Sequence, residues 1–276
     1  MKRLLIAVAL LCIVSSPTLA CEPAALGVSR TLPVGSKGGG EVGLKTYPRT
    51  LKLEPGEVVL TFDDGPVPGR TGKILDALAA ECVKATFFMI GRNAAAAPSL
   101  AARVAQEGHT IGYHSMTHPN MRGISFDKAR ADIEKGFEAV DKAVYGAAGE
   151  QPRSPFFRFP GFADTSQLDS WLASKNMVIF GADLWASDWE PETSDAELNL
   201  VLARLEKSKG GIVLFHDIQP RTIAMFPMFL KELNKRGFRI VHLVPGPGPL
   251  ETNPAPAGWS SQTDRIINAR RGDKAS

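Results

Sequence analysis

Seven short apolar runs alternate with segments of helical spacing along the chain, and this alternation limits the fold more than any other feature. Strands that alternate with helices form parallel sheets covered by those helices. No glycine-rich phosphate loop follows any run, which favours a closed barrel over a nucleotide-binding open sheet. The sequence therefore predicts an α/β fold, a distorted (β/α) barrel of about seven parallel strands. The predicted strands span residues 57–62, 86–90, 110–113, 156–159, 177–182, 212–215 and 238–243.

Segment 126–144 gives the clearest helical pattern between these runs. Its apolar residues recur every three or four positions, as one buried helix face requires, and Ser125 is placed to cap its N-terminus. In barrels of this kind, side chains at the C-terminal ends of the strands carry the chemistry. The apolar stripe consists of Ile133, Phe137, Val140 and Val144, and further helices are predicted over residues 72–82, 99–107, 166–174, 195–207 and 222–236.

Residues 1–20 have the order of a secretory signal peptide, with Lys2 and Arg3 before an apolar stretch and a small residue, Ala20, at its end. The apolar stretch is too short for a membrane-spanning helix. We therefore expect cleavage after Ala20 and a secreted or periplasmic protein that begins at Cys21. Lipid attachment to Cys21 is a less favoured alternative, because Thr18 occupies a position where leucine is usual.

The remainder of the chain divides into three predicted parts. With 44% hydrophobic residues the chain can bury one core, which we place in a domain over residues 57–244. Residues 21–56 are rich in glycine and proline without periodicity, so we expect an extended lead-in that packs on the domain or stays mobile. Closely spaced prolines in residues 245–276 predict a tail that continues neither helices nor strands and is disordered or follows the surface.

Charge and cysteine content set limits on partners. The formal net charge of +3 comes without any basic stripe, so no nucleic-acid partner is predicted, and no obligatory protein partner is evident. Removal of the signal peptide leaves Cys21 and Cys82, which could pair in an oxidising compartment. The sequence does not decide whether they pair, and burial of Cys82 on the apolar side of a helix is the simpler interpretation.

The first predicted barrel strand ends in Asp63 and Asp64, followed by a Gly-Pro pair. Neighbouring strand residues point to opposite faces, so the two carboxylates have different tasks unless the backbone bends there. One can bind a metal while the other addresses a water or substrate. A solvated Asp-Gly-Pro turn is the alternative when this segment is considered alone.

Two histidines, His114 and His118, follow the third predicted strand. At a spacing of four residues they would lie on one face of a helical turn, about 6 Å apart, and could bind one ion. An aspartate and two histidines leave coordination positions open, as catalytic metal sites require. We interpret His109 and His242 as structural, because no comparable residues accompany them.

Two further strand ends carry polar side chains. Arg158 follows the fourth strand, where it can pair with one of the aspartates and keep it ionised. His216 ends the sixth strand, and the ordinary pKa of histidine suits it to protonating a leaving group. Each segment alone is equally compatible with a surface arginine or a histidine that bonds a loop.

Five motifs in this order resemble the polysaccharide deacetylase family that includes the rhizobial chitooligosaccharide deacetylase, also called carbohydrate esterase family 4. The resemblance covers residues 57–244 and implies the NodB-like deacetylase fold. The motifs are TFDDGP at 61–66, HSMTHP at 114–119, RFPG at 158–161, SDW at 187–189 and LFH at 214–216.

The resemblance implies a role for each matching residue. Asp63 would be the general base, oriented by Arg158, and His216 the general acid, tuned by Asp188. Leu214 would line the pocket for the acetyl methyl group. The remaining assignments are Asp64, His114 and His118 as metal ligands, Trp189 as an aromatic wall and the Gly161 backbone N–H as an oxyanion donor. The cofactor implied is one divalent metal ion, zinc or a similar ion such as cobalt.

The sequence departs from the family pattern in two places. Gly161 stands where an aromatic residue is frequent, so the backbone donor is kept while a wall of the groove is lost. Asp183 and Trp185 form a second Asp/Trp set that could replace Asp188 and Trp189.

The predicted function is hydrolysis of N-acetyl groups on an N-acetylglucosamine-type glycan. Removal of O-acetyl groups, as from acetylated xylan, stays open, because the sequence does not fix the atom that bears the acetyl group. A non-catalytic carbohydrate-binding relative is disfavoured, since a binder needs neither Asp63 nor His216. Glycoside hydrolysis is disfavoured because neighbouring aspartates cannot sit ~5 to 9 Å apart across a sugar ring. The glycan, the metal and the oligomeric state stay undetermined.

Overall fold

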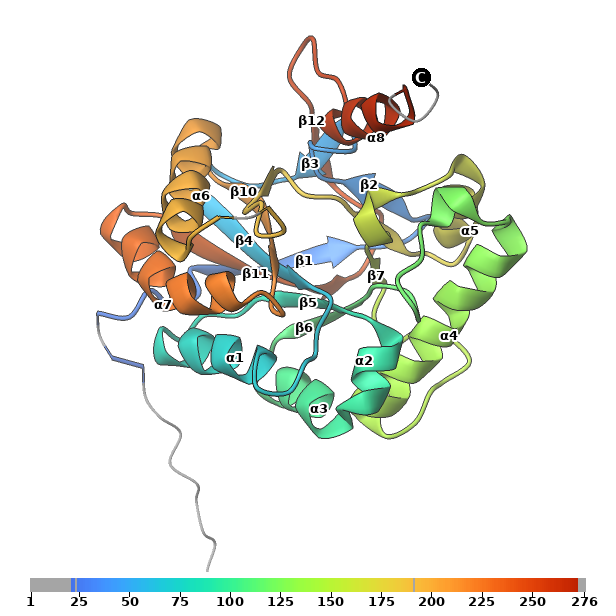
Figure 1. Cartoon of the computed structure of the whole chain (residues 1–276), viewed down its shortest axis with the longest axis horizontal. Coiled ribbons are helices and arrows are strands. Elements are labelled where there is room, and N and C mark those ends of the chain that lie inside the picture. Colours follow the sequence, from blue (N-terminus) through green and yellow to red (C-terminus); the bar gives the residue numbers. More distant parts are fainter. Residues whose placement is uncertain (1–20, 23, 191, 273–276) are drawn as a thin grey trace, which may run out of the picture.

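The computed structural model describes residues 21–272 except residues 23 and 191, so the predicted signal peptide lies outside the described residues. Parallel strands run in the order β4, β5, β6, β7, β8 around a distorted barrel (Figure 1). The chain bends after β8 and continues as β9, which pairs with β10, and β10 pairs with β4. The far edge of β8 pairs with β2, so the two ends of this strand series are joined by the chain between β8 and β9. The predicted α/β barrel is confirmed. These strands are β4 (Glu57–Asp63), β5 (Thr86–Met89), β6 (Thr110–Tyr113), β7 (Phe156–Phe157), β8 (Val178–Phe180), β9 (Leu184–Trp185) and β10 (Gly211–His216).

Alternation along β4 sets which side chains face the barrel interior. Val58, Leu60 and Phe62 pack in the layer between strands and helices. Val59 packs in the second cluster, which includes Phe88 and Phe180 of other strands. Because successive strand residues point to opposite faces, Asp63 falls on the interior side, as Val59 does.

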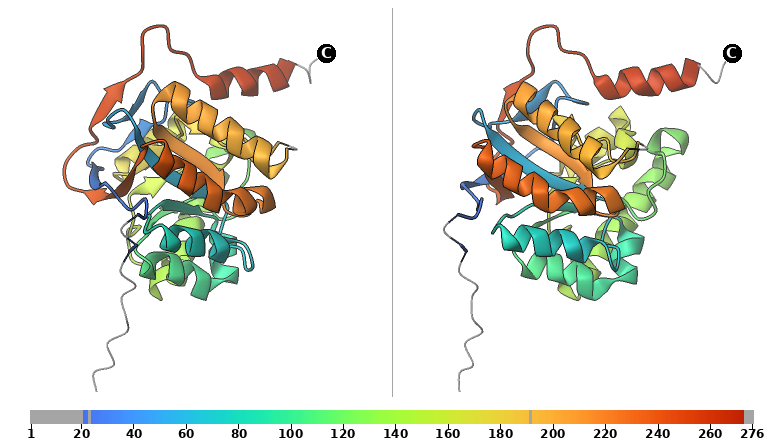
Figure 2. Two further views of the ribbon diagram at one scale, coloured as in Figure 1. Left: turned by 90° about the vertical axis from the view of Figure 1, so that its left-hand side faces the viewer. Right: turned by 60° about the vertical axis from the view of Figure 1, so that its left-hand side comes forward.

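Helices cover the outside of the barrel (Figures 1 and 2). The predicted helix at 126–144 is α4, and its stripe of apolar residues is buried as expected. Ser125 occupies the N-cap position, but its side chain makes no capping hydrogen bond. The helices are α1 (Thr71–Ala80), α2 (Gly91–Ala96), α3 (Pro98–Gln106), α4 (Phe126–Tyr145), α5 (Ser166–Ser174), α6 (Ser194–Ser208) and α7 (Pro220–Lys235).

The segments on either side of the predicted domain are more regular than the sequence suggested. The lead-in contains β1 (Arg30–Gly35), β2 (Gly40–Val42) and β3 (Arg49–Leu51). β2 adds to the edge of β8 and β1 pairs with β11 (Arg239–Gly246). β11 pairs with β1 on one side and with the start of β4 on the other, so this seventh predicted strand extends the sheet beside the other barrel strands. β2 and β3 have three residues each, too few positions for a recognisable alternation, which explains why the sequence did not predict these two strands.

The C-terminal segment also departs from the expected irregular tail. It forms β12 (Thr252–Pro254), antiparallel to β3, and α8 (Gln262–Gly272). The start of α8 is attached to the lead-in through Thr263 N–H, which donates to the carbonyl of Lys45. The rest of the helix extends away from the barrel (Figure 2). The prolines stop regular structure only locally, because edge pairing and a new helix follow them.

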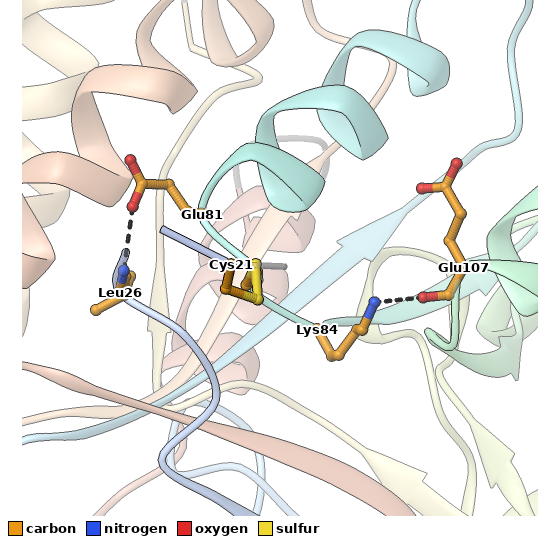
Figure 3. The surroundings of a disulfide bond; sticks show 6 residues. Cys21, Leu26, Glu81, Lys84 and Glu107 are labelled. Atoms are coloured by element: carbon orange, nitrogen blue, oxygen red, sulfur yellow. Dashed lines mark hydrogen bonds between the residues drawn. A yellow bond between two sulfur atoms is a disulfide. The ribbon is translucent and has the colours of Figure 1, made fainter. Parts of the chain in front are cut away.

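Cys21 and Cys82 form a disulfide, a pairing that the sequence left open (Figure 3). The bond joins residues separated by 61 positions and fastens the lead-in to the segment after α1. Leu26 N–H donates to Glu81 Oε2 at 3.1 Å beside it. Cys82 is partly exposed, so the interpretation of it as a simple core residue is wrong. Within the described ranges, none of the helices combines the length and apolar character that crossing a membrane requires.

Candidate active site

The predicted site residues gather at the C-terminal ends of the barrel strands. Asp63 ends β4 and His216 ends β10, and these two residues are partners in the register of the two strands. His114 directly follows β6, and Arg158 directly follows β7. Parallel strands bring their C-terminal ends to one mouth of the barrel, so residues far apart in sequence meet there.

A backbone bend brings Asp64 toward the histidines. Asp64 has φ 78°, in the left-handed region that aspartate adopts more readily than most residues. Asn93 Nδ2 donates to the Asp64 carbonyl at 2.7 Å and holds the bend. Asp64 Oδ1 then lies 3.5 Å from His114 Nε2 and 3.4 Å from His118 Nε2. Because of this bend, Asp64 lies next to the two histidines while its neighbour Asp63 pairs with Arg158 at the same site.

The two histidines converge through an irregular loop, not through the helical turn that their spacing predicted. Ser115 and His118 have φ of 63° and 61°, and the Ser115 hydroxyl accepts from His118 N–H at 3.0 Å. Asp132 on α4 accepts hydrogen bonds from the backbone N–H groups of Met116 and Thr117. The two imidazole rings have centroids 5.0 Å apart. Hydrogen bonds from this loop to α4 therefore hold the two histidines together, in place of the helical turn that the sequence predicted.

Asp64, His114 and His118 fit a divalent ion. Their ligand atoms all lie within 4.8 Å of one another. Asp64 Oδ1 is buried and has no hydrogen-bond partner among the described residues, which an ion would supply. His114 Nδ1 lies 2.7 Å from the Arg158 carbonyl, so this nitrogen carries the proton and leaves the Nε2 lone pair available. Burial lowers the pKa of His114, which keeps its imidazole neutral, as a ligand must be.

Arg158 is fully buried and holds Asp63. Its Nη1 donates to Asp63 Oδ1 at 2.7 Å and to the Thr61 hydroxyl at 2.9 Å. Its Nε and Nη2 donate to the carbonyls of Phe180 and Gly181. Burial lowers the pKa of Arg158, but Asp63 opposes this effect, and an ion pair supported by further hydrogen bonds is the arrangement a buried charge requires. One Asp63 oxygen is thus fixed, and Oδ2 faces His114 Nε2 at 3.7 Å.

His216 is paired with Asp188. Its Nδ1 lies 2.7 Å from Asp188 Oδ1, and its backbone N–H donates to Asp188 Oδ2 at 2.6 Å. Burial by itself would lower the pKa of His216, but the Asp188 carboxylate outweighs it and raises this pKa to about 9. The alternative Asp183 instead accepts from the N–H groups of Leu44 and Ile212 and from the Thr50 hydroxyl, away from His216. The structure therefore resolves the choice of acid in favour of Asp188.

Apolar side chains form a small cluster beside His216. Leu214 packs with Trp185, and the ring of Phe162 stacks on Trp185 at 6.0 Å. The Trp189 ring is 40% exposed and lies perpendicular to His216 at 5.8 Å. Both tryptophans thus lie near the site: Trp185 packs against Leu214, and Trp189 lies beside the His216 ring. Gly161 is exposed, but the Phe162 ring takes a place in this cluster, so the expected loss of an aromatic wall is only partial.

Sequence reasoning missed several residues that support this site, Asn93, Asp132 and Phe162 among them. Asn93 and Asp132 lie within helices and act on loops that are distant in sequence. Nothing in their local pattern distinguishes them from solvent-facing polar residues. Phe162 could have been found from its position one residue after the unusual Gly161.

An α/β barrel with paired acidic and histidine side chains at the C-terminal ends of its strands is an arrangement that hydrolases use. The chain matches the family described as polysaccharide deacetylase over residues 51–177. It belongs to this polysaccharide deacetylase family.

Known proteins of the family are similar over most of this chain. A peptidoglycan-N-acetylglucosamine deacetylase of Bacillus cereus is 35% identical over 192 residues, which cover 68% of this chain and 66% of that protein. A chitooligosaccharide deacetylase of Sinorhizobium fredii is 33% identical over 214 residues, 71% of this chain and 94% of that protein. The solved structure of a Bdellovibrio bacteriovorus peptidoglycan deacetylase aligns with a TM-score of 0.71 and 35% identity, over 80% of this chain and 60% of that one.

Proposed function

We propose that this protein is an exported, metal-dependent deacetylase that hydrolyses N-acetyl groups of N-acetylglucosamine-type glycans. One observation carries the proposal. Asp63 and His216 lie in register on neighbouring strands, each held by its own charged partner, beside the Asp64, His114 and His118 cluster. Hydrolysis of an amide needs a base and an acid near a ligand set, whereas glycan binding alone needs neither.

In the proposed reaction the roles of Asp63 and His216 differ because their partners differ. Asp63, held in an ion pair with Arg158, accepts a proton from the attacking water. The water oxygen bonds to the acetyl carbon, and the carbon–nitrogen bond then breaks. His216, kept protonated by Asp188, donates its proton to the departing sugar nitrogen. The products are acetate and a free amine on the glycan.

Other residues would bind and position the substrate. Leu214 and Trp185 offer an apolar surface for the acetyl methyl group, and the Gly161 backbone N–H would donate to the oxyanion. A divalent ion held by Asp64, His114 and His118 would supply charge that polarises the acetyl carbonyl and the water. The names of the two relatives support this choice of glycan. One is a peptidoglycan-N-acetylglucosamine deacetylase, and the other is a chitooligosaccharide deacetylase.

Acetate release provides the test. The purified protein, loaded with a divalent metal, is incubated with either N-acetylglucosamine oligomers or acetylated xylan. We expect acetate from the oligomers, with His216→Ala as a matched variant that loses turnover. Acetate from xylan alone would make the protein an O-acetyl esterase, and binding of either glycan without acetate would make it a non-catalytic relative.

Export is supported by the disulfide as well as by residues 1–20. Disulfides such as Cys21–Cys82 persist in oxidising compartments outside the cytoplasm. Lipid attachment would alkylate the Cys21 sulfur, and an alkylated sulfur cannot form this bond. The disulfide therefore favours a protein released after cleavage over a lipoprotein.

Intact mass tests this maturation. We expect protein exported by a bacterial host to begin at Cys21, without lipid and with the mass of one disulfide. Reduction should add the hydrogen atoms of two thiols, and a Cys82→Ser variant should not show this gain. Retention of Met1, or a lipid-sized mass increase, would contradict the expectation.

The pH dependence follows from His216. An acid must be protonated to act, so turnover should fall as pH rises through the pKa of His216, which Asp188 raises to about 9. Asp188→Asn removes the negative charge that raises this pKa, so the alkaline limb should move to lower pH. The measurement is kcat against pH for both proteins on the same oligomer. An alkaline limb unmoved in Asp188→Asn would show that another group controls it.

A further inference from the structure

Behind Asp188 lies a second pair of buried polar side chains, Thr222 of α7 and Glu197 of α6. Thr222 is fully buried and Glu197 is 1% exposed. The Thr222 Oγ1 atom lies 2.9 Å from Asp188 Oδ2 and 2.8 Å from Glu197 Oε1. One hydroxyl thus stands between two carboxyl groups.

The number of hydrogens available to these contacts shows that one of the two carboxyl groups is protonated. A threonine hydroxyl carries a single hydrogen, so it can donate to only one of two carboxylates at these distances. The other contact is a hydrogen bond only if that second carboxyl is protonated and donates to the threonine oxygen. One of the two acids must therefore hold a proton.

Asp188 is the ionised member of the pair. Both its oxygens accept from His216, one from Nδ1 and one from the backbone N–H. Glu197 has no ion-pair partner in the part of the chain that the structure describes, and its Oε2 has no hydrogen bond there. An ionised carboxylate in that position would be buried with a single donor, which costs far more than a neutral acid. Burial accordingly raises the pKa of Glu197, which favours its protonated form.

We propose, on the basis of the proposed function, that Thr222 and Glu197 are positioning residues for the catalytic acid. Neutral Glu197 donates to Thr222, and Thr222 donates its hydrogen to Asp188. Asp188 is then saturated with donors and stays ionised, with its oxygens directed at His216. The order of hydrogen bonds runs from α6 through α7 to the end of β10, so packing of these two helices sets the orientation of the acid.

Several charged groups surround this chain of hydrogen bonds and bear on its pH dependence. The carboxylates of Asp63, which ends β4, and of Asp64, which follows it, favour the charged form of His216, and Asp188 contacts His216 directly. Asp217, next in sequence, is buried, with its carboxyl bonded to Thr71. Arg221 of α7 acts on Glu197, but its guanidinium donates to the carbonyl of Glu192. None of these groups forms an ion pair with Glu197 in the described residues.

Variants of the two positions separate this arrangement from a merely structural one. Thr222→Val keeps the side-chain volume but removes the hydroxyl, so Asp188 loses a donor and holds the His216 proton more tightly. We expect kcat to fall about tenfold and the alkaline limb to move to higher pH, since hydrogen bonds to charged groups are strong. Thr222→Ser, which restores the hydroxyl, should recover both quantities.

Glu197→Gln tests the protonation state. An amide can donate to the Thr222 oxygen as a protonated carboxyl does, so this variant should keep the wild-type pH profile. Asp195→Asn, at an exposed acid in the same helical turn, is the control for a change of surface charge. If the alkaline limb moves to lower pH in Glu197→Gln but not in Asp195→Asn, Glu197 is ionised and the proposal is overturned. A Thr222→Val enzyme with unchanged kcat and pH profile would overturn it as well.

A readout independent of turnover keeps this inference separate from the proposed function. The His216 imidazole can be titrated by NMR in the metal-loaded wild type and in each variant. If the wild type releases no acetate from any substrate, the proposed function fails, while the titration still tests the hydrogen bonds. We expect an upward shift of the His216 pKa in Thr222→Val and none in Glu197→Gln, and the opposite pattern contradicts the proposal.

Discussion

Replacing Asp63 with asparagine is expected to lower kcat by about 10²- to 10⁴-fold, the usual contribution of a general base, while bound metal is retained. The amide fills nearly the same volume and its oxygen can still accept from Arg158, but it cannot take up the proton of water. Asp63 is not among the three clustered ligand residues, so metal content should not change. Initial rates of acetate release and elemental analysis of the same preparation check both parts.

The matched comparison is Asp64→Ala at the neighbouring position. It should lose metal, since Asp64 Oδ1 lies within ligand distance of both histidines and has no other partner among the described residues. Arg158 is fully buried, so its loss of an ionised partner in Asp63→Asn will also cost stability, and thermal denaturation must show that the variant is folded. Loss of metal in Asp63→Asn with retention in Asp64→Ala would reverse the two assignments.

Removal of the metal is expected to abolish acetate release, and addition of zinc or cobalt should restore it. The ion would provide the charge that stabilises the oxyanion, and Arg158 cannot replace it, because its guanidinium is already committed to Asp63 and to backbone carbonyls. Asp64→Ala should weaken zinc binding by more than ~100-fold, since even outer partners of ligands typically contribute 10- to 100-fold.

Two measurements make this result specific. Equilibrium dialysis gives zinc affinity without reference to turnover, and His242→Ala serves as a control histidine far from the cluster, hydrogen-bonded to Thr110. Full turnover by a preparation shown to be metal-free would contradict the mechanism. Loss of zinc affinity in the control variant would show that the effect is unspecific.

Much of the barrel and most of the site could be predicted from local sequence. Apolar alternation and helical spacing depend on neighbours within a few positions, so the predicted strands and helices have counterparts within a few residues. Polar residues after buried strands are recognisable for the same reason, and parallel strands bring such ends together. Asp63, His114, Arg158 and His216 meet at one mouth on this basis alone.

Details that depend on loops were predicted less well. The histidine pair was assigned to a helical turn from its spacing, whereas Asp132 of α4 holds it in an irregular loop. Gly161 suggested a missing aromatic wall, yet Phe162 packs on Trp185. In each case the deciding contact comes from a residue whose own sequence context says nothing about its partner.

The sequence by itself determined the order of strands and helices and the identity of the polar residues at the strand ends, because periodicity and residue type are local properties. Only the tertiary structure decided that Asp188 rather than Asp183 pairs with His216, that Cys21 bonds Cys82, and that Asp64 bends back to the histidines. It also decided the state of Glu197, which in sequence is one more acid in the first turn of a helix. Whether such a carboxyl is ionised depends on the burial and hydrogen bonds that distant segments impose, and these exist only after the chain has packed.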